Sequence, residues 1–421
     1  MVSQAAGATA AAVKALAAEL AGITTRPWTL MEVCGGQTHA IVRWGLDQLL
    51  PDGMRLIHGP GCPVCVTPAA TIERALRLAR RPEVILCSYG DMLRVPGEGH
   101  DTLLSVRAAG GDVRLLTSPL QALELARRHP DRQVVFLAVG FETTAPATAL
   151  LARQALTLRA ANLSLLAAHV RVSPAMEALL ADPGNRVQGF LAAGHVCSVL
   201  GTAELEALVT RWRVPVVVSG FEPLELMAGV LACVQQLEAG EARVENAYGS
   251  VVRAGGNPTA RGLLEEVFEP CDRPWRGLGV MAGGGLALRG PYRLLDAVER
   301  FGLAEADQGG GVATRSVAGR STGAAGGLSA CASCGNSATA AGLNPPPASA
   351  AAPADWPLAA AEVCIAGTIL RGLATPEQCP AFGKACTPER PLGAPMVSSE
   401  GACAAYFLYR RRAVKEASKA G

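Results

Sequence analysis

The sequence predicts an α/β fold, with two parallel-sheet α/β domains and a smaller, mostly helical or irregular C-terminal domain. Between residues 28 and 252, short runs that are apolar throughout alternate with longer amphipathic stretches. This alternation is typical of parallel strands that are covered on both faces by helices. The last sixty residues have a different character, because they hold four cysteines among prolines and glycines. They therefore predict a separate structural unit.

The strands and helices follow one another along the chain in regular alternation. Nine runs are expected to be strands: Thr29–Val33, Arg55–His58, Val84–Ser88, Val113–Leu116, Val134–Val139, Leu163–Ala167, Gln188–Ala192, Val214–Ser219 and Gly249–Val252. The stretches between them that are expected to be helices include Thr67–Arg80, Pro119–Arg128, Pro146–Arg159, Thr202–Arg211 and Glu222–Leu237. Nine strands are many for one small sheet, and a break occurs around Pro130. We therefore predict one domain at 24–130 and a second at 131–252.

The remainder of the chain, 253–421, is expected to form the C-terminal domain. Residues 253–305 mix loop and helix patterns. Residues 309–354 consist almost entirely of Gly, Ala, Ser, Thr and Pro, a composition that cannot build a core and predicts a flexible insert. A cysteine-bearing, structured pattern returns at 362–409.

Composition excludes several classes of protein. Half of the residues are hydrophobic, so the chain as a whole is not disordered. The charges nearly balance, at 38 basic against 36 acidic residues, which gives no electrostatic argument for nucleic acid or an anionic membrane. The longest apolar stretches, such as Leu226–Val234, are too short for a membrane span of about 20 residues. We find no signal peptide, and 13 cysteines, an odd number, argue against a secreted disulfide framework. A cytoplasmic protein is expected.

The C-terminal cysteines form the largest group. Cys364, Cys379, Cys386 and Cys403 have the spacing C-x14-C-x6-C-x16-C. Four thiolates suit a [4Fe–4S] cluster or a tetrahedral zinc ion. The paired C-x2-C turns of structural zinc sites are missing from this set, which favours iron–sulfur. Four buried, inert thiols are the alternative.

Two further cysteine motifs follow predicted strands. Cys62 and Cys65 form a C-x-x-C pair within disulfide reach, and a helix that begins at Pro68 is expected to favour the thiolate. Half of a structural metal site is the alternative for this pair. Cys34 follows the first strand and has His39 five residues on. It is either a packing cysteine or, because Gly35 and Gly36 leave its sulfur uncovered, a ligand for low-spin iron or copper.

Other polar residues also follow strands, in glycine-rich turns where parallel sheets place their sites. Glu142 and Glu222 each follow Gly-Phe, and each is expected either to cap a helix or to line a cofactor cleft between the lobes. His195 is expected to be a satisfied, half-buried histidine. Cys331 and Cys334 lie inside the insert, where no fold holds them. The remaining cysteines are expected to belong to the core: Cys87, Cys197, Cys233 and Cys271.

Taken together, the chain resembles the HypD family of [NiFe]-hydrogenase maturation factors over about 25–305 and 362–409. The matching segments include MEVCGGQTHAIVRWGLDQLLP, LIHGPGCPVCV, GFETTAPATA, EVFEPCDRPWRGLGV and CPAFGKACTPERPLGAPMVSSEGACAAYF. The resemblance implies a scaffold, rather than a conventional enzyme, on which a transient Fe(CN)2CO moiety is assembled. It also implies a HypC-type chaperone partner and a HypE-type cyanide donor.

The resemblance further assigns roles to the cysteines. The four C-terminal cysteines would hold a [4Fe–4S] cluster, and Cys34 would hold or help to transfer iron, with His39 nearby. Cys62 and Cys65 would be the redox-active pair, and Glu400 would help to couple the cluster to the cleft.

The sequence departs from the family pattern at several positions. Gln37 replaces a histidine, Ala366 and Pro395 replace cysteines, and the 309–354 insert is not typical. An accessory disulfide is therefore in doubt, and Cys331 and Cys334 are a hypothetical substitute for it. Two other functions stay open: a freestanding iron–sulfur thiol–disulfide oxidoreductase and a zinc-stabilised interaction module.

Overall fold

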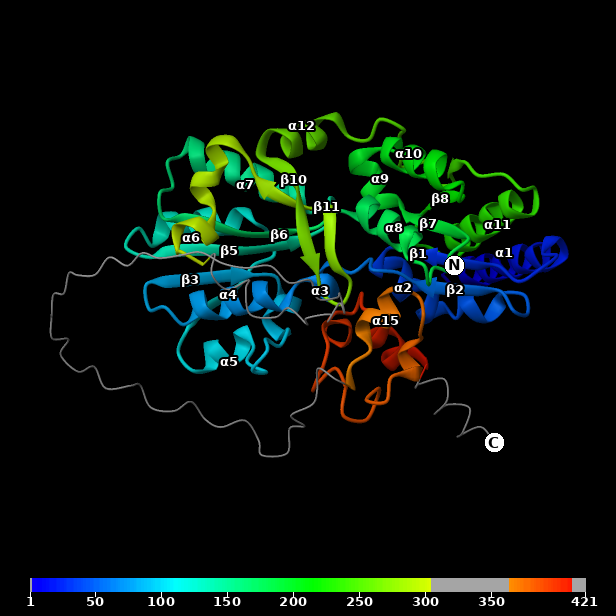
Figure 1. Ribbon diagram of the computed structural model, residues 1–421, viewed down its shortest axis with the longest axis horizontal. Helices are drawn as coiled ribbons and strands as arrows, with labels where there is room; N and C mark the ends of the chain where they lie inside the picture. The colour runs from blue at the N-terminus through cyan, green and yellow to red at the C-terminus, as the bar shows by residue number, and fades with distance from the viewer. Residues whose placement is uncertain (1, 304–362, 411–421) are drawn as a thin grey trace, which may run out of the picture.

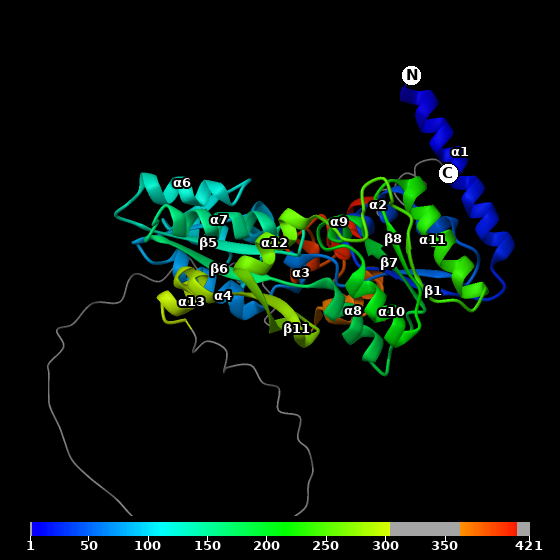
Figure 2. The same cartoon turned by 90° about the horizontal axis from the view of Figure 1, so that it is seen from above.

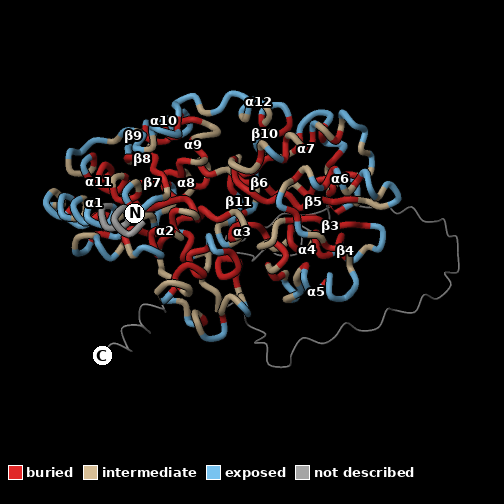
Figure 3. Tube along the Cα trace, turned by 180° about the vertical axis from the view of Figure 1, so that it is seen from behind, coloured by how far each residue is buried: buried red, intermediate tan, exposed pale blue. Residues whose placement is uncertain are grey.

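The computed structural model describes residues 2–303 and 363–410. The insert at 309–354, with Cys331 and Cys334, lies outside the described residues. Two parallel sheets lie end to end in the molecule (Figure 1). The buried residues follow the strands of both sheets, whereas the outer helices and loops are exposed (Figure 3). The prediction of parallel-sheet α/β architecture is confirmed.

The first sheet has five parallel strands in the order β2-β1-β7-β8-β9. Its strands are β1 (Thr29–Glu32), β2 (Arg55–His58), β7 (Gly189–Ala193), β8 (Val216–Ser219) and β9 (Val244–Asn246). The second sheet has four parallel strands in the order β4-β3-β5-β6. Its strands are β3 (Val84–Ser88), β4 (Asp112–Leu115), β5 (Gln133–Gly140) and β6 (Leu163–His169).

The two sheets do not divide at residue 130. The first sheet takes β1 and β2 from before that residue and β7, β8 and β9 from after it, and the second sheet also draws strands from both sides. The chain thus builds part of one sheet, crosses to complete the other, and then returns. The break at Pro130 is a turn between α6 (Leu120–Arg128) and β5 inside the second sheet. The interleaved sheets contradict the predicted split into consecutive lobes.

Helices cover both faces of the sheets, as the alternation predicts (Figure 2). Four of the predicted helices, besides α6, are α4 (Ala69–Ala79), α7 (Ala145–Thr157), α10 (Ala203–Trp212) and α11 (Pro223–Glu238). Others are α1 (Val2–Ile23), α2 (Gly35–Trp44), α3 (Pro63–Val66), α5 (Leu103–Ala108), α8 (Val172–Ala181), α9 (Gly194–Leu200), α12 (Pro258–Val267) and α13 (Ala297–Arg300). No helix in the described part of the chain is both long and apolar enough to cross a bilayer.

Two predicted segments have a different structure. The run 249–252 is mostly turn, and the last strand of the first sheet is β9, five residues earlier. This edge strand carries Glu245 and is only partly buried. Its sequence therefore has no apolar run from which a strand could be predicted. Residues 268–288 form an antiparallel hairpin of β10 (Phe268–Trp275) and β11 (Gly279–Leu288). Prolines in β10 and a glycine run in β11 hide this hairpin from a strand pattern.

Residues 363–410 fold into short helical turns and loops. These are α15 (Ala366–Leu370), the 3-10 turns η5 (Pro376–Gln378) and η6 (Ala394–Met396), and a helix at 402–410. This C-terminal unit lies beneath α2, α3 and β2 (Figure 1). Gly372 contacts β2 so closely that a Cβ there would lie 2.3 Å from Ile57 Cδ1. The unit therefore packs directly against the first sheet.

Candidate functional site

Cys34 lies in the turn that follows β1, with extended backbone, and forms the N-cap of α2. The turn after β2 is stacked tightly on it: Gly35 N donates to Gly61 O at 2.9 Å. A Cβ at Gly61 would lie 2.2 Å from Cys34 N, so only glycine permits this approach. The two glycine-rich turns thus form one compact structure beyond the carboxyl ends of β1 and β2.

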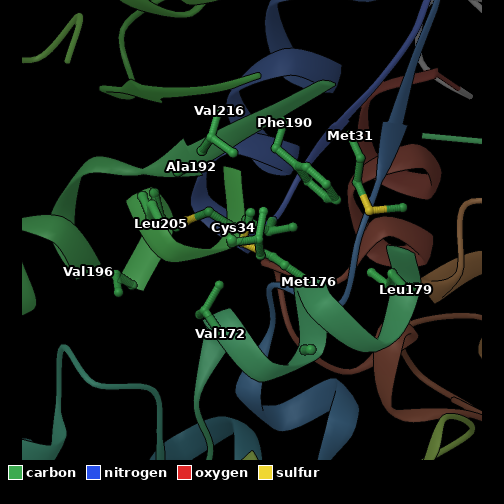
Figure 4. Packing of buried hydrophobic residues seen from close by; sticks show 14 of the residues in the cluster. Met31, Cys34, Val172, Met176, Leu179, Phe190, Ala192, Val196, Leu205 and Val216 are labelled. Atoms are coloured by element: carbon green, nitrogen blue, oxygen red, sulfur yellow. The ribbon is translucent and has the colours of Figure 1, made fainter. Parts of the chain in front are cut away.

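The Cys34 side chain is buried, with 3% of its surface exposed. It lies among apolar side chains that include Val172, Met176 and Ala192 (Figure 4). Burial raises the pKa of its thiol far above the usual range, and the nearby carboxylates of Glu32 and Glu400 raise it further. The expectation that the two glycines leave this sulfur uncovered is wrong. In this structure Cys34 is a neutral, protected thiol.

The imidazole that faces Cys34 belongs to His195 and not to His39. The Cys34 Sγ is 3.8 Å from His195 Nδ1 and 3.9 Å from Nε2. Burial lowers the pKa of His195 to about 4, so its ring is neutral at pH 7. His39 instead makes hydrogen bonds with Ser399 O at 3.1 Å and Tyr409 Oη at 3.0 Å. His39 therefore holds the C-terminal unit in place.

Glu32 organises the base of the Cys34 turn, and sequence reasoning missed it. Its fully buried carboxylate accepts hydrogen bonds from Cys34 N at 2.8 Å and from the Thr38 hydroxyl. It also pairs with His58 Nδ1 at 2.7 Å, and His58 Nε2 lies 3.2 Å from Tyr406 Oη in the C-terminal helix. The available sequence signal was a polar residue at the end of an apolar run, once at Glu32 and once at His58. The structure places these two residues opposite each other at the ends of β1 and β2.

Cys62 and Cys65 form a disulfide, with both residues buried. Cys62 is the N-cap of α3, and its Sγ accepts a hydrogen bond from Cys65 N at 3.1 Å. A helix begins at Pro68 as predicted, since Pro68 is the N-cap of α4, and the short helix α3, which carries Cys65, precedes it. Helix α3 contacts η6 of the C-terminal unit. The disulfide thus lies between the Cys34 turn and that unit.

The four C-terminal cysteines line one cavity. Its walls are Cys364, Ala366, Ile369, Cys379, Phe382, Cys386, Gly393, Pro395, Met396 and Cys403. Burial raises the pKa of Cys403 well above its usual range, and the other three thiols raise it further because they are close. A backbone amide already points at sulfur, since Leu392 N lies 3.4 Å from Cys386 Sγ. Among the described residues, no three His, Cys, Asp or Glu side chains are arranged to hold a single metal ion.

The two positions that depart from the family's cysteines line the same cavity. A Cβ built on Gly393 would lie 2.7 Å from Cys364 Sγ, 3.7 Å from Pro395 Cδ and 3.9 Å from Ala366 Cβ. Ala366 and Pro395 are therefore neighbours in the cavity wall. Cysteines at these positions would lie beside the four thiols, and in this chain that wall is unreactive.

The three candidate glutamates have different surroundings. Glu142 is buried; its Oε1 accepts a hydrogen bond from Val172 N at 3.0 Å, and its Oε2 has no partner among the described residues. Desolvation raises the pKa of this carboxyl to about 7. Glu222 is exposed and caps α11. Glu400 packs on Gly35, beside Cys34, and precedes Cys403 by three residues.

Gln37, which departs from the family's histidine, is buried at the start of α2. Its Nε2 donates to three carbonyl oxygens, those of Ala192 at 3.4 Å and of Ser219 and Gly220 at 3.2 Å. Cys87, Cys197 and Cys233 are buried as predicted, whereas Cys271 is half-buried. The Gln37 amide therefore ties α2 to the ends of β7 and β8.

Fold and site together define a class: a cysteine-centred α/β protein in which a lone thiol, a disulfide and a four-thiol cavity lie close together. The HypD family model, described as the hydrogenase formation hypA family, matches residues 8–322 and 349–410. The chain is 41% identical to the hydrogenase maturation factor HypD of Rhodobacter capsulatus, over 94% of this chain and 92% of that protein. It is 40% identical to HypD of Escherichia coli K12, over 94% and 93%. The chain belongs to the HypD family of hydrogenase maturation factors.

Proposed function

We propose that this protein is the scaffold on which the Fe(CN)2CO moiety of a [NiFe]-hydrogenase is assembled. It would act with a HypC-type chaperone and accept cyanide from a HypE-type donor. The observation that carries the proposal is the placing of Cys34, between His195 on one side and the turn that leads to the Cys62–Cys65 disulfide on the other. A soft thiolate beside an imidazole suits low-spin iron as cargo.

The chemistry of Cys34 follows from its burial. A neutral thiol must lose its proton when a metal binds, so iron binding and proton release are coupled. His195 is the imidazole that faces Cys34 and is itself neutral, so its ring is free to ligate, whereas its lowered pKa disfavours it as the acceptor of that proton. The apolar side chains around Cys34 exclude water, which protects a bound iron fragment from exchange with solvent.

The four-thiol cavity supports the assignment of a [4Fe–4S] cluster. A cubane cluster needs sulfurs spread around a space, whereas zinc needs them converging on one point. The described thiols surround a space and hold no single-ion geometry. When bound, such a cluster supplies single electrons. Cys62 and Cys65 would take up two electrons and two protons as their disulfide opens to a dithiol.

The alternative, a freestanding thiol–disulfide oxidoreductase, is less well supported. Its disulfide would have to meet a partner's thiol directly, but Cys62 and Cys65 expose only 3% and 1% of their surface. A buried disulfide suits an internal relay better than turnover on external proteins. Cys34 also has no role in that alternative.

The infrared spectrum of the protein, purified anaerobically with its co-expressed small partner, tests the proposal. Metal-bound cyanide and CO should absorb in the triple-bond region, and Cys34→Ala should abolish those bands. Cys233→Ala, which removes an equally buried thiol from α11, should keep them. Bands that persist in Cys34→Ala would overturn the role of Cys34. No bands, with rapid reduction of a small disulfide, would favour the oxidoreductase.

A metal analysis tests the cavity separately. We expect iron and acid-labile sulfide in about equal amounts, lost in Cys386→Ala and kept in Cys271→Ala, a half-buried cysteine outside the cavity. Zinc without sulfide would instead support the interaction module.

A further inference from the structure

The tip of the β10–β11 hairpin lies between helix α3, which carries the Cys62–Cys65 disulfide, and the C-terminal unit. Arg276 N donates to Val66 O, the last residue of α3, at 2.8 Å. On the other side, a Cβ at Gly277 would lie 2.8 Å from the Cα of Gly367 in α15. The hairpin end reaches toward α3 and α15 (Figure 1). Arg276 is therefore fixed by its backbone between Cys65 and the wall of the four-thiol cavity.

The guanidinium of Arg276 is held there without a carboxylate partner. Among the described residues it forms no ion pair, and its Nε is buried without a hydrogen-bond partner. Its positive charge is favoured by negative charge on Cys364, as a thiolate, and then by Glu73 and Glu98. Glu73 accepts a hydrogen bond from Glu98 N at 2.7 Å, and among the described residues neither carboxylate is hydrogen-bonded to the guanidinium. A buried cation is costly unless some negative charge compensates it.

The two cysteine sites near Arg276 differ in the negative charge that they place beside its guanidinium. The disulfide is uncharged, whereas four thiolates around an iron–sulfur cluster carry net negative charge that grows by one unit on reduction. A fixed cation nearby stabilises the more negative, reduced state, and it does so strongly because little water screens it. Thiolates around a cluster would therefore add to the negative charge that Glu73 and Glu98 already place near Arg276.

We propose that Arg276 is a positioning residue that supplies a fixed positive charge between the Cys62–Cys65 pair and the four-cysteine cavity, and so raises the reduction potential of the cluster held there. This inference rests on the proposed cluster. It assigns no proton transfer to Arg276, because a guanidinium stays protonated. The function of Arg276 is to stabilise the reduced state of a cluster that lies close to the disulfide.

The test is a redox titration of the full chain, purified anaerobically and followed by the paramagnetic signal of the reduced cluster. At the wild-type midpoint potential, Arg276→Gln should raise the oxidised-to-reduced ratio about tenfold, which corresponds to about 59 mV for one electron. Arg276→Lys should keep the midpoint near the wild-type value at pH 7. Arg128→Gln, which removes one exposed positive charge from α6, should not change it.

The outcomes separate the two proposals. Wild-type protein without iron and sulfide would overturn the cluster itself. A full cluster with an unchanged midpoint in Arg276→Gln would overturn the role of Arg276 alone. If Arg276→Gln loses its cluster, Arg276→Lys decides: a buried lysine loses its proton in alkaline solution, so the midpoint should fall from pH 7 to pH 10 more than in the wild type. Parallel pH profiles would overturn the inference.

Discussion

Replacing Glu32 with alanine should destabilise the protein strongly, because this buried carboxylate is the shared hydrogen-bond acceptor at the base of the Cys34 turn. It is fully buried and accepts hydrogen bonds from Cys34 N, the Thr38 hydroxyl and His58 Nδ1. A hydrogen bond to a charged group contributes about 1.5–3 kcal/mol, and a buried donor left unpaired costs about 1–3 kcal/mol. We expect a loss of about 4 kcal/mol for Glu32→Ala.

Equilibrium urea unfolding, followed by tryptophan fluorescence, measures this loss. Glu238→Ala is the matched control, since Glu238 also accepts three hydrogen bonds, from Thr25 N, Thr25 Oγ1 and Trp28 Nε1. Two of these bonds are exposed and the third is partly buried, so water can replace most of the lost acceptor and this variant should lose less stability. Equal losses in the two variants would refute the reasoning from burial. Glu32→Gln, which keeps one acceptor oxygen, should fall between wild type and Glu32→Ala.

Two further predictions concern the site. Glu142 has a folded-state pKa of about 7 against an ordinary value of 4.5, so the folded state binds more protons than the unfolded state between these values, and stability falls as pH rises through this window. Glu142→Gln should therefore gain on the order of 2–3 kcal/mol relative to wild type between pH 5 and pH 8 in urea unfolding, and a difference that does not depend on pH would contradict the burial of this carboxyl. Gly61→Ala should cost about 2 kcal/mol or more, because its Cβ would overlap the backbone of Cys34. Gly262→Ala, in α12 with nothing within 4 Å, should instead gain about 1 kcal/mol; equal effects in thermal unfolding would contradict the close approach.

The sequence was sufficient for most strands and for the cysteine groups, because both are local patterns. β2 and β3 have the predicted bounds, since apolar runs between turn residues specify buried strands. The four C-terminal cysteines line one cavity, as their grouping indicated. The predictions that were wrong concern contacts between residues far apart in the sequence. The partner of Cys34 was sought five residues away at His39, whereas His195 is 161 residues away.

Strand order explains both that error and the arrangement of the site. β1 has β2 on one side and β7 on the other, and in a parallel sheet the turns after neighbouring strands lie side by side. Cys34 follows β1, Cys62 follows β2, and His195 follows β7. The order β2-β1-β7 alone therefore places the lone thiol between the disulfide and the imidazole. Two consecutive lobes split at residue 130 would have put β7 in a different sheet from β1 and separated His195 from Cys34. The return of the chain to its first sheet is what assembles the candidate iron site, so shifting β7 out of register with β1 should abolish the site even if every cysteine is kept.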